Sequence, residues 1–198
     1  MPLHSSLTDP NLHEPKGAAN ASTGMVYVAD GAGSGTWTYS PTGYVRYQNS
    51  GAAQVFTSTP QKLVINGAGP NSTEAYLPRE IRGTGSLWDT VTNDVTPIAQ
   101  GDAFVCRLSF PLTANTGSPT LLSLVLDIGA TAGITIPIVE AEIPILKPVP
   151  YTVTTTINFD ALDTFLANGG QFFVSVNTGT VTVLNPTIQV TRVHGEVM

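Results

Sequence analysis

The chain has 198 residues and a net charge of −6, and 41% of its residues are hydrophobic whereas only 11% are charged. This length suits one domain with a sizeable core, and the low charge with many β-branched residues excludes a disordered chain. Lys and Arg together number only 8, so we expect no nucleic-acid binding, because DNA-binding proteins cluster cationic side chains.

Residues 1–24 show no hydrophobic periodicity and contain several small residues. Pro15 fixes its own φ and favours an extended Glu14, so residues 12–16 should be exposed and non-helical. We expect an irregular amino-terminal arm that becomes ordered against a partner. No signal region and no window near the ~18 apolar residues of a membrane span are present, so no membrane association is expected.

A hairpin is predicted directly after the arm. Residues 25–28 form a β-type run, and the glycines at 31, 33 and 35 permit the turn back into residues 36–39. We therefore divide the chain into an arm and hairpin, residues 1–40, and a body, residues 41–198.

Two long apolar runs, residues 121–128 and 134–145, lie near the middle of the body. Pro137 and Pro144 cannot donate ladder hydrogen bonds, which predicts an edge strand or a bulged strand for the second run. An apolar edge needs a cover, and a neighbouring subunit is the simplest one. The predicted subunit interface accordingly consists of Ile136, Ile138, Ile143 and Ile145.

The last third of the chain contains one convincing helical stretch, residues 160–166. Asp160 is interpreted as its cap, and Gly169 and Gly170 as its end. Residues 171–176 and 181–183 are predicted to form a hairpin around residues 177–179. Counting all the runs gives about ten to twelve short strands, which favours an all-β fold, an antiparallel sandwich of two sheets.

Two segments resemble known proteins. Residues 9–17 (DPNLHEPKG) followed by residues 26–37 (VYVADGAGSGTW) resemble the amino-terminal segment of tailed-bacteriophage virion proteins, which include capsid decoration proteins and fibres. The signals from Leu87 to Val193, among them residues 124–129 (LVLDIG) and 165–170 (FLANGG), resemble jelly-roll, tumour-necrosis-factor-like sandwiches. That second resemblance implies a jelly-roll body and a homotrimer.

Few residues suggest chemistry. Gly31 to Gly35 lacks the Lys-Ser/Thr of a phosphate loop and leads into a strand, so we interpret it as a turn. His4, His13 and His194 are scattered and Cys106 is the only cysteine, so we expect no metal site, no cofactor and no disulfide within the chain. Cys106 is interpreted as a small buried hydrophobe.

Carbohydrate chemistry has two candidate residue sets. Glu140 and Glu142 share one face of an extended strand, but a glycosidase also needs a sugar groove between its carboxylates, so a solvated pair is favoured. Six aromatic residues suit a sugar-stacking platform and equally suit the core or a subunit interface, which we favour. They are Trp37, Trp88, Tyr39, Tyr44, Tyr47 and Tyr76.

We predict a non-enzymatic capsid decoration (cement) protein, located on the capsid surface of a virion assembled in a host cytoplasm. Its partners would be the major capsid protein and itself. The predicted capsid-binding residues are Leu12, His13, Glu14, Pro15 and Lys16. Two alternatives stay open: a fibre or tail protein that recognises a host surface glycan, and a polysaccharide depolymerase.

Overall fold

A computed structural model describes residues 21–29, 32, 35–128, 134–145 and 150–195. The chain separates into two compact units, of which the first ends at Ser40 and the second begins at Pro41. The second unit is a jelly-roll-like β-sandwich built from antiparallel sheets, as the sequence predicts. No described helix has the length and hydropathy needed to cross a bilayer.

The first unit contains the predicted hairpin. Strand β1 (Met25–Ala29) pairs antiparallel with β2 (Gly35–Tyr39), and Tyr27 lies opposite Trp37. The rings of Tyr27 and Trp37 meet edge to face with their centroids 5.4 Å apart. A cross-strand aromatic pair of this kind stabilises a short hairpin.

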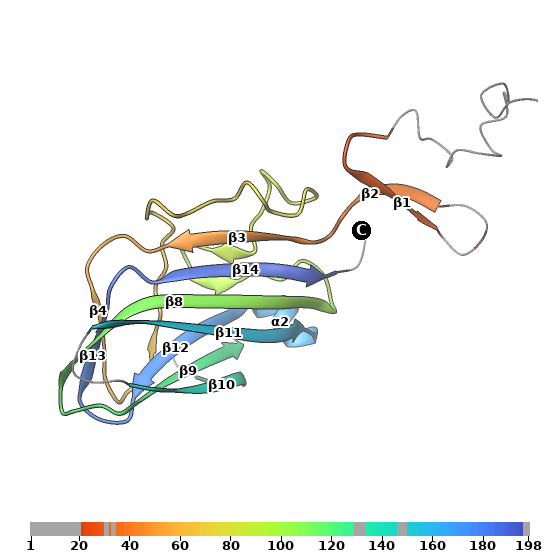
Figure 1. The fold of residues 1–198 in the computed structure, drawn as a ribbon. Helices are drawn as coiled ribbons and strands as arrows, with labels where there is room; N and C mark the ends of the chain where they lie inside the picture. Colours follow the sequence, from red (N-terminus) through yellow and green to blue (C-terminus); the bar gives the residue numbers. More distant parts are fainter. Residues whose placement is uncertain (1–20, 30–31, 33–34, 129–133, 146–149, 196–198) are drawn as a thin grey trace, which may run out of the picture. The chain divides into compact units, whose positions relative to one another are not determined.

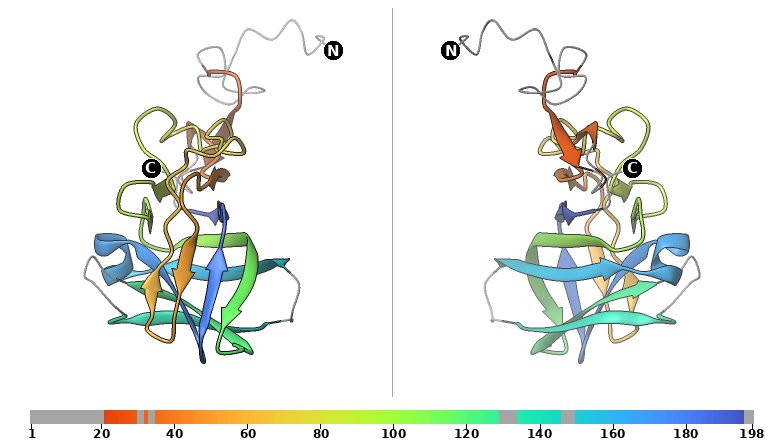
Figure 2. Two further views of the ribbon diagram at one scale, coloured as in Figure 1. Left: turned by 90° about the vertical axis from the view of Figure 1, so that its left-hand side faces the viewer. Right: turned by 90° about the vertical axis from the view of Figure 1, so that its right-hand side faces the viewer.

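Two six-stranded sheets form the second unit (Figures 1 and 2). We call them the long sheet, which contains the two longest strands, and the short sheet. The strands of the long sheet are β3 (Gly43–Gln48), β4 (Gln54–Phe56), β8 (Asp102–Thr116), β11 (Tyr151–Ala161), β13 (Thr180–Val183) and β14 (Thr187–His194). The strands of the short sheet are β5 (Gln61–Lys62), β6 (Trp88–Asp89), β7 (Asp94–Val95), β9 (Leu121–Ile128), β10 (Pro137–Pro144) and β12 (Gly170–Val176).

Strand β8 organises the long sheet. It pairs with β11 on one side and with β14 and then β13 on the other, while β3 and β4 extend β14 and β13. Alternate residues of β8, such as Phe104, Cys106 and Leu108, are buried. Because successive strand side chains point to opposite faces, this period of two places one face in the core and leaves the other at the surface. Most buried residues of the two sheets form one continuous core, whereas Val125 and Phe173 of the short sheet are buried outside it.

Strand β10 lies at the edge of the short sheet and pairs with β9 alone. Its register shifts between Pro137 and Val139, which marks a bulge. The prediction of a bulged edge strand is therefore confirmed, for the reason that proline cannot donate to a ladder.

The predicted helix is present, but it starts later in the chain than residue 160. Helix α2 (Asp163–Asn168) begins after Leu162, whose side chain makes no capping hydrogen bond, and it ends at Gly169 with φ 69°. Asp160 belongs to β11, where it pairs with Ala103, so it is not a cap. The β-alternation of β11 continues to Ala161 and delays the helix.

The predicted hairpin around residues 177–179 is wrong. Strand β12 pairs with β9 in the short sheet, whereas β13 pairs with β8 in the long sheet, so the turn crosses between sheets. Asn177 explains the crossing, because its Oδ1 accepts hydrogen bonds from the backbone N–H groups of Thr120 and Leu121 at 3.0 and 3.2 Å. The turn is tied to the start of β9 and not to a partner strand.

Candidate functional site

The predicted capsid-binding residues Leu12, His13, Glu14, Pro15 and Lys16 lie outside the described residues. His194 is exposed near the end of β14. No group of three or more potential metal ligands is brought together in the described part of the chain.

The four predicted interface isoleucines separate into two pairs. Ile136 and Ile138 have exposed fractions of 48% and 37%, so both lie at the surface. Ile143 packs against the core, and Ile145 belongs to it with an exposed fraction of 7%. The apolar character of this run is thus explained in part by the core of the same chain.

The carboxylates of β10 lie on its outward face. Glu140 and Glu142 are both exposed, while Val139, Ala141 and Ile143 between and beside them pack against the core. Charged residues and prolines on an edge strand disfavour pairing with another chain. Self-pairing of two β10 edges would bring these like charges together, so the edge is protected against it.

Most of the described aromatic candidates are structural. Trp88 is buried against Phe172, with ring centroids 6.3 Å apart, and its Nε1 donates to the carbonyl of Ile65 at 3.1 Å. Tyr44 and Tyr76 are different, because they stack at 4.9 Å and Tyr76 keeps an exposed fraction of 55%. This pair is an aromatic surface beside β3.

Buried Tyr47 forms part of a separate crevice of about 610 Å³. Its hydroxyl bonds to Glu74 and, at 3.0 Å, to the hydroxyl of Ser86. Burial, followed by the hydrogen bond to Glu74, raises the pKa of Tyr47 to about 12. In the same crevice, backbone hydrogen bonds from Thr92 and Val91 lower the pKa of Asp89. The hydrogen-bonding groups of Tyr47 and Asp89 are thus paired within the protein, so we interpret the lining of this crevice as structural.

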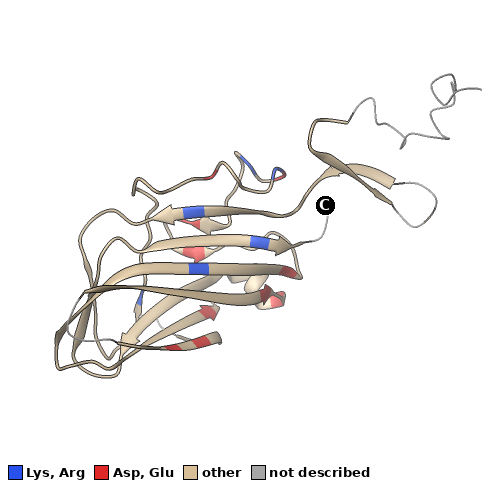
Figure 3. Cartoon of the chain, in the orientation of Figure 1, with Lys and Arg blue, Asp and Glu red and all other residues tan. Residues whose placement is uncertain are grey.

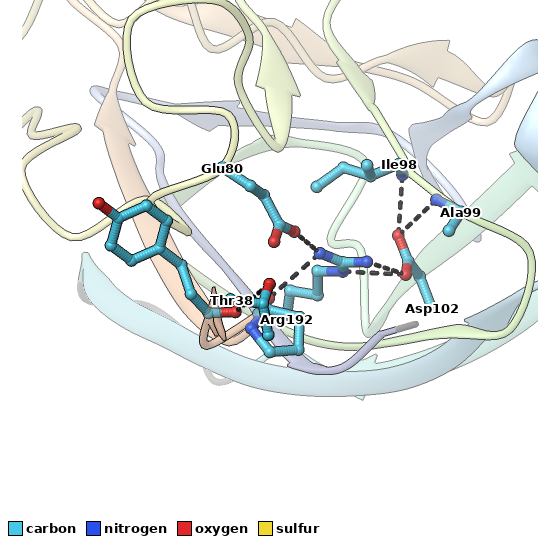
Figure 4. Close-up of polar contacts among 8 residues, drawn as sticks. Thr38, Glu80, Ile98, Ala99, Asp102 and Arg192 are labelled. Atoms are coloured by element: carbon cyan, nitrogen blue, oxygen red, sulfur yellow. Dashed lines mark hydrogen bonds and ion pairs between the residues drawn. The ribbon is translucent and has the colours of Figure 1, made fainter. Parts of the chain in front are cut away.

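A buried ion cluster lies near the carboxyl end of β14 (Figure 4). Arg192 has an exposed fraction of 0%, and its Nε and Nη2 donate to Oδ1 of Asp102 at 2.9 and 2.6 Å. Its Nη1 donates to Glu80 and to the carbonyl of Pro41, the latter at 3.2 Å. The other oxygen of Asp102 accepts from the backbone N–H groups of Ile98 and Ala99 at 2.8 and 3.0 Å. The cluster fixes the last strand to the residue where the sandwich begins.

The outward face of the long sheet carries a different arrangement, a hollow of about 340 Å³ that we call the arginine hollow. In the register of the sheet, Gln189 on β14 lies between Arg46 on β3 and Arg107 on β8. Two strand spacings separate the arginines, or roughly 10 Å between backbones. The arginine hollow is lined by Arg46, Asn71, Arg107, Ser109, Thr187 and Gln189.

The two guanidinium groups differ in their partners. Arg46 donates through Nη2 to Oε1 of Gln189 at 3.0 Å. No described residue accepts a hydrogen bond from the guanidinium of Arg107, which is exposed. Figure 3 shows β3 and β8 each with a basic residue, whereas the acidic residues of β10 belong to the other sheet. The arginine hollow is therefore a cationic site on an acidic chain.

Sequence reasoning missed the arginine hollow. Arg46 and Arg107 stand on strands that are distant in the chain and meet only through the pairing of β14 with both. A signal was present, because each arginine occupies a polar position of an alternating strand, Val45-Arg46-Tyr47 and Cys106-Arg107-Leu108. Alternation predicts that both face outward, but not that they face outward side by side.

Comparison with protein-family models finds no match, and neither does comparison with curated proteins. Among solved structures, the chain is similar to Eiger TNF from S. frugiperda, with a TM-score of 0.46, 8% identity and coverage of 79% of this chain and 96% of that one. The PRD1 vertex protein P5 gives 0.46 and 10%, with coverage of 98% of each chain. An isomalto-dextranase of Arthrobacter globiformis T6 complexed with panose gives 0.30 and 14%, with coverage of 73% and 23%.

The structural neighbours of this chain thus include a TNF-like jelly roll and a phage vertex protein. All three TM-scores lie below 0.5, so these likenesses carry no argument about activity or partners.

Proposed function

We propose that this chain is a non-enzymatic virion structural protein, a capsid decoration protein that attaches through its amino-terminal arm. The observation that carries the proposal is that, among the described residues, every buried member of the main core lies between Val45 and Val190. The described residues among the first forty thus contribute nothing to that core, and we assign the first forty residues to attachment. The resemblance of residues 9–17 and 26–37 to phage virion proteins supports the same role.

In this proposal the arm, with Leu12 to Lys16 at its centre, binds a groove between major capsid subunits, and the sandwich is displayed outside. A homotrimer would carry three arms, each of which raises the effective concentration of the other two at the shell. Attachment would then be strong even where a single arm binds weakly. Ile136 and Ile138, both exposed, are the predicted isoleucines that remain candidates for contacts between subunits.

The test compares capsid occupancy of the full chain with that of a chain lacking residues 1–24. We expect the shortened chain to be absent from purified capsids, as measured by quantitative gel or mass spectrometry. A point variant with Leu12, His13 and Lys16 replaced by alanine should also lose occupancy, whereas its matched control, alanine at Ser5, Ser6 and Thr8, should keep it. Undiminished occupancy of the shortened chain would refute the role of the arm.

A second candidate, a fibre or tail protein that recognises a glycan, is favoured by one observation. The stacked Tyr44 and Tyr76 pair is at the surface, where a large aromatic ring suits the apolar face of a sugar. The number of copies per virion separates the two candidates. A number that scales with capsid subunits supports decoration, and a number that scales with tails or vertices supports a fibre.

A further inference from the structure

We propose that the arginine hollow binds the carboxylate of an acidic sugar of the uronic acid class. The site is built from the outward side chains of three neighbouring strands, β3, β14 and β8, which are held in register by ladder hydrogen bonds. Sites on paired strands are held more rigidly than sites on loops. This inference does not depend on a virion location.

Arg46 and Arg107 give the arginine hollow a positive charge, which favours an anionic ligand. Around Arg107 the neighbours in register are uncharged, namely Gln189 on β14 and Thr156 on β11, and Val105 and Ser109 flank it along β8. Arg46 and Arg107 therefore face each other's like charge across Gln189 with no described carboxylate between them. A carboxylate bound there would relieve this repulsion and accept charge-assisted hydrogen bonds from guanidinium groups, which match its planar geometry.

Arg46 and Arg107 have different roles in this proposal. The hydrogen bond from Arg46 to Gln189 holds the Arg46 side chain in one orientation. Arg107 retains its donors, because no described residue takes them. Arg107 is thus the main carboxylate ligand, and Arg46 is the second cation that sets the charge of the site.

The size and the remaining lining of the arginine hollow favour a sugar over a simple anion. A volume of about 340 Å³ lies at the small end of ligand sites and exceeds what a single carboxylate fills. Ser109 and Thr187 supply hydroxyl groups and Asn71 an amide, which can donate to and accept from sugar hydroxyls. Asn71 is itself held by hydrogen bonds to Oε1 of Gln48 at 3.1 and 3.3 Å.

An aromatic surface stands next to the arginine hollow. Tyr44 is two residues from Arg46 on β3 and therefore on the same face of the sheet. The segment that carries Tyr76 runs along β3, with the N–H of Tyr44 donating to the carbonyl of Tyr76 at 2.8 Å and the N–H of Arg46 to that of Thr73 at 3.0 Å. A chain of two or three uronates can place one carboxylate on the arginines and stack a neighbouring ring on Tyr76.

The experiment titrates the full chain with trigalacturonate and, as a matched ligand, with its methyl ester, which keeps the sugar rings and removes the charge. Calorimetry and amide shifts of Thr187 and Gln189 report binding. We expect saturable binding of the acid and a loss of about tenfold or more with the ester, since a charge-assisted hydrogen bond is worth at least that factor. Equal affinity for acid and ester overturns the proposal, as does the absence of saturable binding.

Substitutions of the arginines test whether the ligand binds in the arginine hollow. Arg107→Gln and Arg46→Gln should each weaken binding, Arg107→Gln by about tenfold or more, while Arg107→Lys keeps the charge and loses the planar fork, so it should bind with intermediate strength. Arg79→Gln is the matched control, because Arg79 is an exposed cation that does not line the arginine hollow. Wild-type affinity in Arg107→Gln overturns the proposal.

Two other occupants are separated by the same samples. An Asp-Asp dipeptide that binds as well as trigalacturonate would assign the arginine hollow to a protein carboxylate and overturn the sugar proposal. Sedimentation tests a second copy of the chain, whose exposed Glu140 and Glu142 are of opposite charge. If Arg107→Gln lowers the oligomeric state and no uronate binds, the arginine hollow is a contact between copies and the proposal fails. None of these results bears on capsid occupancy, so the proposed function is tested separately.

Discussion

Arg192 shows how a single charged residue can be held inside a sandwich. Arg192 faces inward on β14, as do Ile188 and Val190, whose side chains are apolar. Burial of a charge costs several kcal/mol unless the charge is paired and hydrogen-bonded, and Asp102, Glu80 and the carbonyl of Pro41 meet that need. Gly195 packs against the guanidinium so closely that any side chain there would overlap it.

We predict that Arg192→Met lowers the free energy of unfolding by about 3–5 kcal/mol, because it leaves the fully buried carboxylate of Asp102 without its cation. Urea denaturation followed by fluorescence measures the change. The double variant Arg192→Met/Asp102→Leu should lose less than the sum of the two single changes, since it removes both charges together. Arg107→Met on the exposed face of the long sheet is the control and should change stability by no more than about 0.5 kcal/mol. A small loss in Arg192→Met would contradict the structural role of the cluster.

Cys106 is the second residue with a testable environment. It is fully buried in the core on β8, and burial raises the pKa of its thiol. Since the thiolate is the reactive form, we predict no labelling of the native protein by a thiol reagent at pH 8, with labelling only as the chain unfolds. The reagent's absorbance over time, with and without urea, measures this. Rapid native labelling would show that the thiol is accessible.

The sign of the pH dependence follows from the same pKa. A thiol whose pKa is higher in the folded state stabilises the fold fully below its unfolded pKa of about 8.5 and loses that contribution as pH rises above it. Stability should therefore fall above about pH 8.5, and Cys106→Ala should fall less over the same range.

At the scale of elements, the sequence predicts what depends on local pattern. Alternation in residues 151–159 and the prolines of β10 were sufficient to predict a strand and an edge, and both are confirmed. Asp160 was misassigned because a carboxylate before a helix has the same local appearance as one at the end of a strand. The choice between a hairpin and a sheet crossing at residues 177–179 depends on Asn177 binding the start of β9, which lies far away in sequence.

The arginine hollow belongs to the same class of long-range features. Its cations are placed by strand pairing across β14, and no short window of the sequence contains both of them. The interface isoleucines show a different difficulty, because a single apolar run of the sequence contains both core and surface positions. Alternation along β10 places Ile143 on the inward face and Ile138 on the outward face.

The junction between α2 and β12 gives a prediction at this scale. A Cβ at Gly170 would overlap the ring of Phe165 and approach a methyl group of Leu126 at 2.9 Å. We predict that Gly170→Ala lowers the free energy of unfolding by about 1–3 kcal/mol through overpacking. Gly85→Ala is the matched control, because its nearest neighbour would be Cβ of Ile81 at 3.9 Å. Equal denaturation curves for the two variants would contradict the packing of α2 on the sheet.

On the scale of the whole molecule, the inward and outward faces of the sheets have different roles. Their inward faces share one core, while the outward face of the long sheet keeps uncharged polar side chains around two arginines. The arginine hollow lies on that outward face and takes no residue from the core. A ligand bound there would therefore leave the packing of the sandwich unchanged.

The position of the core in the chain leads to the last prediction. All described residues of the main hydrophobic core lie within the second unit, as do both partners of the buried pair between Arg192 and Asp102. We predict that residues 41–198 alone fold to the same sandwich, with an unfolding free energy equal to that of the full chain within the extrapolation error of about 10–15%. Circular dichroism and urea denaturation of the two chains measure this. The cluster variant Arg192→Met in the shortened chain is the positive control, since it must destabilise both chains equally if they share one fold. A shortened chain with a lower midpoint, or one in which Arg192→Met has no effect, would show that the first forty residues contribute to the sandwich, and attachment could then not be their separate role.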